Sequence, residues 1–388
     1  MAEPSRYADL RRLATESLEA NVVSLASGSY LVAGAHQFRS LWTRDFAHAI
    51  PGLLAAGRSD VVRDHLDLLL AHAHPDDGLL PRTFDTYDAK LRVAWASVSR
   101  LIPFARGILP VKDRLRPEYR DQHGQLAVDG NALVVIGAAR YRDATGDQAW
   151  WDQHLDVLRR VHGFYTPHLS GGLVHQPPFS DWQDSVRREG ASFYTNLLTW
   201  KAAELLGEDH QASQLRESLE TTFLGEGGLY RSLSEGDWIS LEGNLLAVDL
   251  GYVTSERARE LQASLRASPF WTRHELPGFD TYPDYPRSWR GPAVIFAGLG
   301  HYHDRILWSW LTALSARVAI RVGDLDGAQI ALDALQTWVR RDGVVSEIYQ
   351  DRSPHLPWTS LTYRSEAPFS WGAAMILAAL ETLGALES

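Results

Sequence analysis

The sequence predicts an all-α fold in which six helical hairpins close into an (α/α)6 toroid. Apolar residues recur at helical spacing in about twelve segments of this chain of 388 residues. Tight glycine turns and long loops join these segments alternately, and the long loops hold nearly every cluster of Trp, Arg, Asp and Glu. Because a toroid gathers its long loops on one face, we expect a functional site on that face.

The expected helices follow one another along the whole chain. Trp308, Leu311, Leu314 and Val318 illustrate the pattern, with apolar residues three or four positions apart. No linker rich in Pro, Ser or Gly divides the sequence, so we expect one domain that spans residues 1–388. The helices are predicted at 5–24, 45–57, 59–74, 129–145, 147–166, 189–207, 209–223, 241–251, 254–267, 303–322, 324–341 and 366–385.

The helices fall into two alternating classes. Every second one, as at 131–141, is apolar or rich in small residues throughout, whereas the others, as at 209–223, carry charge along one face. We expect the first class to form an inner ring and the second an outer ring. An α-solenoid is the alternative, but a solenoid repeats at a fixed length and the sequence shows no such period.

Two kinds of connection join the helices. In the tight turns, a Gly that tolerates a left-handed C-cap precedes a Ser, Thr or Asp that can cap the next helix. These turns contain Gly57, Gly146, Gly207, Gly251 and Gly323. The long connections lead from outer to inner helices at 25–44, 75–128, 167–188, 224–240, 268–302 and 342–365, with short strands expected at 172–175 and 228–231.

Composition excludes several classes of function. The net charge of −10 argues against a nucleic acid or an anionic membrane as the main partner. The absence of cysteine excludes disulfides, thiolate metal sites and cysteine nucleophiles. No apolar span has the length of a transmembrane helix or signal sequence, so we expect a cytoplasmic protein. The 14 Trp exceed ordinary usage.

The first candidate for chemistry is the segment 180–190, between a Pro-bearing loop and an apolar helix. It contains Asp181, Trp182 and Asp184. A carboxyl group that a Trp shields from water tends to have a raised pKa, which suits a general acid. The alternative is that these aspartates cap the next helix or pair with the arginines that follow them.

The second candidate is Glu347, which lies in the last long loop before Ile348 and Tyr349. A Glu framed by apolar and aromatic residues is poorly explained as a solvated surface charge. It could serve as the base that activates a water nucleophile. The alternative is an ion pair with Arg352 or Arg364.

Residues suited to sugar binding lie at the starts of two other helices. Trp42, Arg44 and Asp45 open one helix, and Asp129 opens another. Asp and Arg each make two directional hydrogen bonds to neighbouring hydroxyl groups, and a Trp can cover the apolar face of a pyranose. Helix N-capping is the alternative for the two aspartates. Further aromatic residues beside helix starts are Trp289, Tyr302, Trp308, Trp310, Phe369 and Trp371.

We expect no metal and no cofactor. The close pairs His301/His303 and His72/His74 each lack a third ligand at recognisable spacing. The glycine patterns of phosphate and dinucleotide sites are absent, and so is the Gly-x-Ser-x-Gly pattern of serine hydrolases.

Taken in their order along the chain, these motifs resemble those of the six-hairpin glycosidases, especially the catalytic domains of amylo-α-1,6-glucosidases and neutral-invertase-like enzymes. Trp42–Asp45 is similar to the W-x-R-D opening of that family, and Val128–Asp129 to its V-D-A stretch. Asp181–Asp184 resembles the W-M-D element. Tyr302–Trp310 resembles Y-H-x-G-x-x-W-P-W, and Ser346–Tyr349 resembles P-E-I-Y/F.

The resemblance implies an inverting glycoside hydrolase that acts on an α-linked glucoside or a related small sugar. Asp184 would be the general acid and Glu347 the general base, with their carboxyl groups about 6.5–9.5 Å apart. A small-molecule carbohydrate is then the expected partner, and the oligomeric state stays open. The residues expected to bind the sugar are Trp42, Arg44, Asp45, Asp129, Trp182, Gln183, Tyr302, His303, Trp308 and Trp371.

Thr43 and Ser309 stand where the family has Gly and Pro, and no β-sandwich precedes the helices. These departures argue against polymer substrates. Two other readings compete with the hydrolase. A sugar 2-epimerase or aldose–ketose isomerase would need a His acid/base pair, for which His303 is the best candidate. A glycan-binding toroid without activity would bind sugars without turnover.

Overall fold

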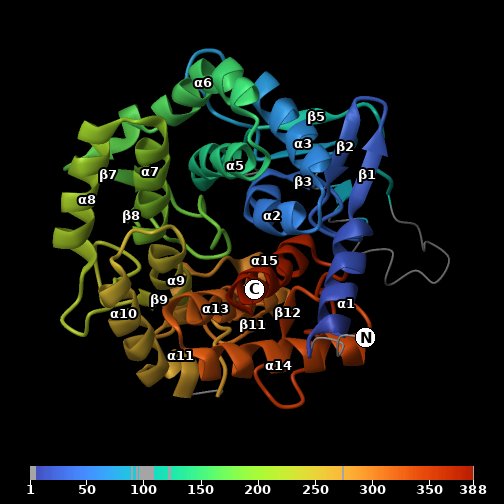
Figure 1. Ribbon diagram of the computed structural model, residues 1–388, viewed down its shortest axis with the longest axis vertical. Helices are drawn as coiled ribbons and strands as arrows, with labels where there is room; N and C mark the ends of the chain where they lie inside the picture. Colours follow the sequence, from blue (N-terminus) through green and yellow to red (C-terminus); the bar gives the residue numbers. More distant parts are fainter. Residues whose placement is uncertain are drawn as a thin grey trace.

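The computed structural model describes residues 6–387 apart from 89–90, 93–94, 96–108, 121–123 and 273–274. Six inner helices form a closed ring, because each packs against the next and the last, α15, packs against the first, α2 (Figure 1). The predicted (α/α)6 toroid is therefore confirmed. The inner helices are α2 (Thr43–Ala55), α5 (Asp129–Thr145), α7 (Phe193–Leu206), α9 (Leu241–Asp249), α13 (Ser309–Val322) and α15 (Ser370–Glu387).

The outer ring covers the inner one. Its helices bury one face each, whereas α5, α7, α9 and α13 are buried on nearly all sides. Near the chain ends, α1 packs on both α14 and α15, which joins the first hairpin to the last. The outer helices are α1 (Ala8–Glu19), α3 (Ser59–Ala71), α6 (Gln148–Gly163), α8 (Asp209–Phe223), α10 (Ser255–Ala267) and α14 (Leu325–Asp342).

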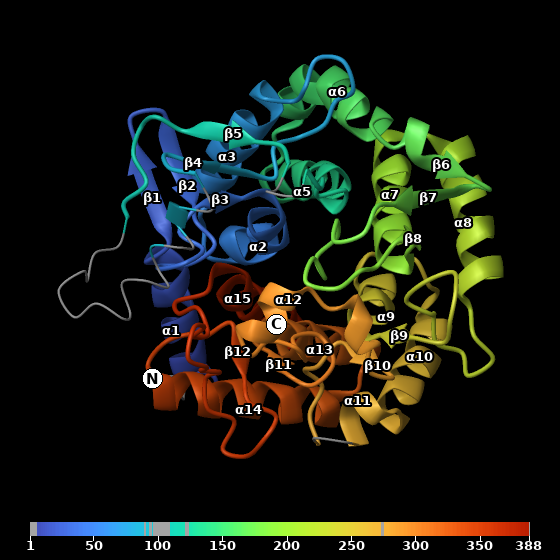
Figure 2. The ribbon, with the colours of Figure 1, turned by 180° about the vertical axis from the view of Figure 1, so that it is seen from behind.

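The long connections carry the sheet structure and two short helices, α11 (Pro269–Thr272) and α12 (Pro292–Phe296). Figure 2 shows the ring from behind, with α12 near its centre. The strands form small antiparallel pairs and triplets: β1–β2, β3–β4–β5, β6–β7–β8, β9–β10 and β11–β12. They are β1 (Val22–Leu25), β2 (Gly28–Leu31), β3 (Leu41–Trp42), β4 (Thr83–Asp85), β5 (Arg116–Glu118), β6 (Leu169–Ser170), β7 (Leu173–Gln176), β8 (Gly190–Ala191), β9 (Ile239–Ser240), β10 (Thr281–Tyr282), β11 (Leu307–Trp308) and β12 (Ile348–Tyr349).

Some predicted boundaries are wrong. The helix expected at 303–322 begins only at Ser309, because Leu307 and Trp308 pair with Tyr349 and Ile348 as strands. The strand expected at 172–175 is present as β7, whereas the segment 228–231 forms only isolated bridges. Part of the long connection 75–128 lies outside the described residues.

The tight turns have the predicted chemistry in part, since the residues before α3 and α8, Arg58 and Glu208, make no side-chain cap. Gly146, Gly207 and Gly323 end their helices in the left-handed conformation. Asp147 and Asp324 then cap the following helices, each accepting a hydrogen bond from a backbone N–H three residues on. Among the described residues, no helix has the length and apolar character needed to cross a bilayer.

Candidate active site

One pocket opens where the long connections enter the inner ring. The starts of α2 and α15, the loop 182–184, the residues before α13 and the segment around Glu347 all contribute to it, as the loop asymmetry predicts. Its volume is about 130 Å³. The lining residues are Phe38, Trp42, Arg44, Asp45, Trp182, Asp184, Tyr302, Trp308, Glu347, Phe369 and Trp371.

Glu347 is held as a hydrogen-bond acceptor on one side of this pocket. Tyr302 Oη donates to its Oε1 at 2.5 Å, Tyr363 Oη donates to its Oε2, and the backbone N–H of Glu366 reaches Oε2 at 3.3 Å. Burial raises the pKa of Glu347, and these donors oppose the rise because they stabilise the carboxylate. Its backbone carbonyl accepts from the N–H of Ser309, which ties the segment to the start of α13.

Asp184 lines the same pocket with 43% of its side chain accessible. Partial loss of solvent in the pocket raises its pKa, and Arg44, whose Nη1 lies 3.4 Å from Asp184 Oδ2, lowers it. The two carboxyl groups interact, because the charge of Asp184 contributes to the raised pKa of Glu347. The pocket thus holds two carboxyl groups that lie 163 residues apart in the chain and have different hydrogen-bond partners.

Two more carboxyl groups lie near Arg44. Asp45 lines the pocket, and burial together with the nearby charges of Glu347 and Asp184 raises its pKa to about 7 although Arg44 opposes this. Asp129 is completely buried and accepts two hydrogen bonds from Arg44, at 2.5 and 3.1 Å. Asp129 therefore lies behind Arg44 rather than on the pocket wall.

Aromatic rings form the remaining walls. The ring of Trp182 meets those of Trp308 and Trp371 edge to face, with centroids 5.4 and 6.0 Å apart. Trp371 stacks on Trp310 at 4.2 Å and on His48 at 4.3 Å, and His48 and Trp310 lie 5.9 Å apart. Rings locked in this way present a fixed apolar surface of the kind that covers a sugar ring.

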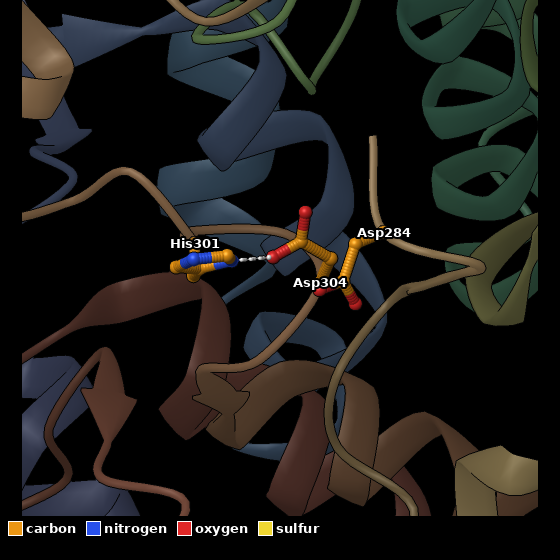
Figure 3. A group of neighbouring side chains, drawn as sticks. All are labelled: Asp284, His301 and Asp304. Atoms are coloured by element: carbon orange, nitrogen blue, oxygen red, sulfur yellow. Dashed lines mark hydrogen bonds and ion pairs between the residues drawn. The ribbon is translucent and has the colours of Figure 1, made fainter. Parts of the chain in front are cut away.

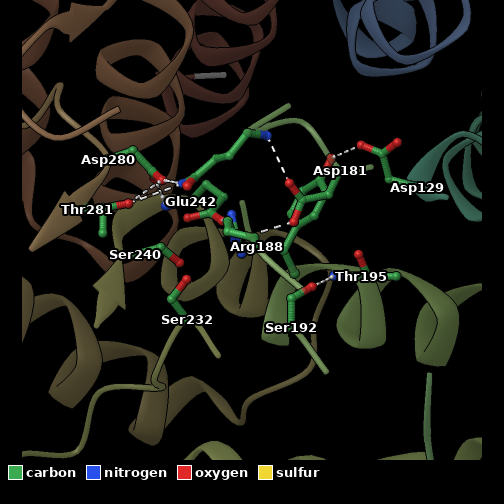
Figure 4. A network of polar contacts seen from close by, with 12 residues as sticks. Asp129, Asp181, Arg188, Ser192, Thr195, Ser232, Ser240, Glu242, Asp280 and Thr281 are labelled. Carbon is green, nitrogen blue, oxygen red and sulfur yellow. Dashed lines mark hydrogen bonds and ion pairs between the residues drawn. The ribbon is translucent and has the colours of Figure 1, made fainter. Parts of the chain in front are cut away.

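A buried polar network fixes the loop that carries Asp184. Asp181 Oδ1 accepts from the backbone N–H of Gln183 at 2.9 Å, and Arg188 lies 3.4 Å from Asp181 and 3.5 Å from Glu242 (Figure 4). The side-chain amide of Gln183 donates to Asp280 and, at 3.2 Å, to Thr281. These contacts anchor the residues on either side of Trp182, so Trp182 and Asp184 are held in position.

No protein-family model matches the chain, and no curated protein matches its sequence. Among solved structures, a glycosidase variant in complex with glucose superposes with a TM-score of 0.66 over 99% of both chains, at 16% identity. A GH63 mannosylglycerate hydrolase from Thermus thermophilus in complex with glucose superposes over 95% of this chain and 99% of its own, at 16% identity and a TM-score of 0.64. A rhamnosidase from Klebsiella oxytoca with rhamnose bound matches 97% of this chain and 64% of its own, at 15% identity and a TM-score of 0.64.

The fold is that of the six-hairpin glycosidases. The predicted resemblance is confirmed at this level. The finer resemblance to amylo-α-1,6-glucosidases stays a prediction.

On this glycosidase fold, most of the residues expected from the sequence come together. Three of them do not line the pocket. Asp129 lies behind Arg44, Gln183 is buried in the loop network, and His303 is buried with its ring parallel to that of Trp308. The residues that do line it are Trp42, Arg44, Asp45, Trp182, Asp184, Tyr302, Trp308, Glu347 and Trp371.

The contacts of the candidate carboxyl groups bear on the alternatives weighed for them. Asp181 forms the ion pair with Arg188, whereas Asp184 faces Arg44. Within the described residues, no arginine pairs with Glu347. Its donors are the hydroxyls of Tyr302 and Tyr363 and a backbone amide.

Sequence reasoning missed three residues of the site. Phe38 lines the pocket, Tyr363 donates to Glu347 Oε2, and the backbone N–H of Glu366 reaches the same oxygen. The Glu366 carboxylate accepts from the backbone N–H groups of residues 36–38, which fixes Phe38 at the pocket. Phe369, expected from its place beside a helix start, also lines the pocket, whereas the three missed residues have no local pattern.

One group of the described side chains has metal-ligand composition, namely Asp284, His301 and Asp304 (Figure 3). His301 Nδ1 lies 2.7 Å from Asp304, as Figure 3 shows. Arg290 also donates to Asp304 at 2.7 Å, and Arg305 pairs with Asp284. The two carboxylate charges are thus already balanced by arginines.

Proposed function

We propose that the protein is an inverting glycoside hydrolase that cleaves an α-linked glucoside or a related small sugar. The observation that carries the proposal is the pair Asp184 and Glu347 on one aromatic-walled pocket, in a fold shared with glycosidases. Asp184 gives its proton to the glycosidic oxygen as the C–O bond breaks. Glu347 takes a proton from the water that attacks the anomeric carbon from the opposite ring face.

The environments of the two carboxyl groups support these roles. Glu347 accepts three hydrogen bonds, which favour the carboxylate that a base must be. Asp184 accepts one long contact from Arg44, and burial favours its protonated form, which an acid must have. The carboxyl separation that inversion requires, about 6.5–9.5 Å, is part of the proposal.

The walls and charges support a neutral sugar in the pocket. Trp42, Trp308 and Trp371 offer ring faces and edges, while Arg44 and Asp45 offer hydrogen bonds to hydroxyl groups. Glucose is bound in two of the structurally similar proteins, and one of these is a mannosylglycerate hydrolase. A small glucoside with a compact aglycone is therefore the substrate class that we propose.

Asp184→Asn and Glu347→Gln are expected to abolish most turnover, because a positioned acid or base contributes about 10²–10⁴-fold to the rate. The assay is release of free sugar from a panel of small α- and β-glucosides. Proton NMR of the first product then reports the anomer, and inversion from an α-glucoside gives the β-anomer first.

Gln211→Glu serves as a control, since Gln211 lies on the outer helix α8 and does not line the pocket. Circular dichroism verifies that all three variants fold. Hydrolysis near the wild-type rate in either site variant would overturn the assignment. Tight sugar binding with no turnover by the wild type would instead favour a binding protein.

A further inference from the structure

A chain of hydrogen bonds runs from the helical core to Asp184. His48 Nε2 lies 3.0 Å from Tyr194 Oη, and Tyr194 Oη donates to Asp129 Oδ2 at 3.2 Å. Because Tyr194 gives its only proton to Asp129, Nε2 of the neutral His48 carries the proton that faces Tyr194. Arg44 then donates to both oxygens of Asp129, and its Nη1 reaches Asp184 at 3.4 Å.

The two carboxylate contacts of Arg44 are unequal. With Asp129 it makes a bidentate pair at 2.5 and 3.1 Å, which is the strongest geometry for an arginine and a carboxylate. With Asp184 it makes one long contact. Asp129 has no exposed surface, so protein groups replace the water that would otherwise solvate its charge. Most of the positive charge of Arg44 is therefore balanced on the side away from the pocket.

The unequal sharing of Arg44 between Asp129 and Asp184 matters if Asp184 is a general acid. An arginine in full contact with Asp184 would stabilise the carboxylate and remove the proton that the reaction needs. We propose that Asp129 and Tyr194 are positioning residues, which hold Arg44 in a bidentate pair so that Asp184 keeps its proton. The proposal rests on the assignment of Asp184 as the acid.

The other charged groups that face Asp184 come from four segments. Arg82 precedes β4 and lies over the ring of Trp42, and its charge favours the carboxylate of Asp184. The anions favour the protonated form; they are Asp45 on α2, Asp181 on the same loop and Glu347 before β12. The variants below leave all of these in place, so a change can be attributed to the pair of Arg44 and Asp129.

In the pH profile of kcat/KM, the basic limb reports deprotonation of the general acid. Asp129→Asn and Arg44→Gln are expected to move this limb in opposite directions. Asp129→Asn removes a negative charge and frees Arg44 for Asp184, so the limb moves to lower pH by about one unit, as for an opposite charge within 4–6 Å. Arg44→Gln removes the cation, so the limb moves to higher pH. Tyr194→Phe keeps both charges and removes one hydrogen bond, so it gives a smaller shift in the direction of Asp129→Asn.

Asp324→Asn is the matched control. Asp324 pairs with Arg266 at 2.6 Å and caps the outer helix α14, a role that Asn also fills. It should leave both limbs of the profile unchanged. A purely structural role for Asp129 would lower kcat/KM equally at every pH and leave the limbs in place, and this result would overturn the proposal.

A second readout does not depend on turnover. The side-chain carboxyl carbon of Asp184, labelled with ¹³C and assigned with Asp184→Asn, reports its titration directly by NMR. Opposite shifts in Asp129→Asn and Arg44→Gln support the proposal, and equal titration in wild type and both variants overturns it. Failure of the wild type to hydrolyse any glucoside would count against the proposed function, while this titration would still decide how Arg44 acts on Asp184.

Discussion

At the scale of single residues, the site depends on which partner each carboxyl group has. Glu347 is buried yet accepts from two tyrosine hydroxyls, Tyr302 and Tyr363, whereas Asp184 accepts one long contact from Arg44. The same burial that raises both pKa values is thus opposed by different groups. An acid and a base can coexist in one pocket because their environments differ in this way.

Tyr363→Phe tests this at Glu347, the proposed base. Removing the hydroxyl takes away a donor that stabilises the Glu347 carboxylate, so the pKa of Glu347 rises. Because the base works only when deprotonated, the acidic limb of kcat/KM should move to higher pH while the basic limb stays in place. Tyr252→Phe, which alters a tyrosine hydroxyl near Arg216 on the outer ring, is the control. An unchanged acidic limb would show that Glu347 is not the group that sets it.

At the scale of elements, the inner ring depends on close helix packing. A Cβ added at Gly52 in α2 would lie 2.1 Å from the backbone oxygen of Ala374 in α15, and backbone atoms cannot move aside as a flexible side chain can. The two helices that close the ring therefore touch where a glycine removes the side chain. The starts of the same two helices carry Arg44, Asp45 and Trp371, which line the pocket.

Gly52→Ala is expected to destabilise the protein by about 1–3 kcal/mol or more, because overpacking forces the two helices apart. Gly384→Ala in α15 is the matched control. Nothing lies within 4 Å of a Cβ added there, so the higher helix propensity of Ala should raise stability by up to about 1 kcal/mol. Urea unfolding of both variants measures the difference. Equal stability of Gly52→Ala and wild type would contradict the packing argument.

At the scale of the whole molecule, a buried ion cluster joins three inner helices. Asp249 at the end of α9 lies 3.1 Å from Arg140 of α5 and 3.3 and 3.0 Å from Arg317 and Arg321 of α13. Burial by itself would raise the pKa of Asp249, but the three arginines outweigh it and lower the pKa to about 2. The cluster therefore links helices that belong to different hairpins.

Asp249→Asn should lower the free energy of unfolding by up to about 3 kcal/mol, because it leaves the buried Arg317 and the partly exposed Arg140 and Arg321 without their shared counter-charge. The pKa of Asp249 is lower in the folded than in the unfolded chain, so its stabilisation is present above about pH 4 and is lost as the pH falls through 2. The variant should lack that part of the acid dependence. Urea unfolding between pH 2 and pH 7 tests this. Glu16→Gln, at an exposed pair with Arg12, should change little, and an equal loss in both variants would contradict the role of the cluster.

Much of this arrangement was readable from the sequence. Periodic apolar residues and capped glycine turns are local signals, so they predicted the alternating helices and the class of each ring. The alternation of short and long connections then predicted that one face would hold the site. Trp42 and Arg44 lie where a long connection meets an inner helix, and Asp184 and Glu347 lie within long connections, so all four stood out in the sequence.

Other features depend on contacts between distant segments. No local sequence pattern shows that Asp129 lies behind Arg44 or that Gln183 anchors a loop. The same holds for Tyr363 and Glu366, which donate hydrogen bonds to Glu347. Closure of the ring brings these residues together, and burial together with neighbouring charges then sets each pKa. The sequence by itself determined which helices form and most of the residues that line the pocket. The tertiary structure decided the partner of each carboxyl group, because a hydrogen bond depends on distance in space and not on spacing along the chain.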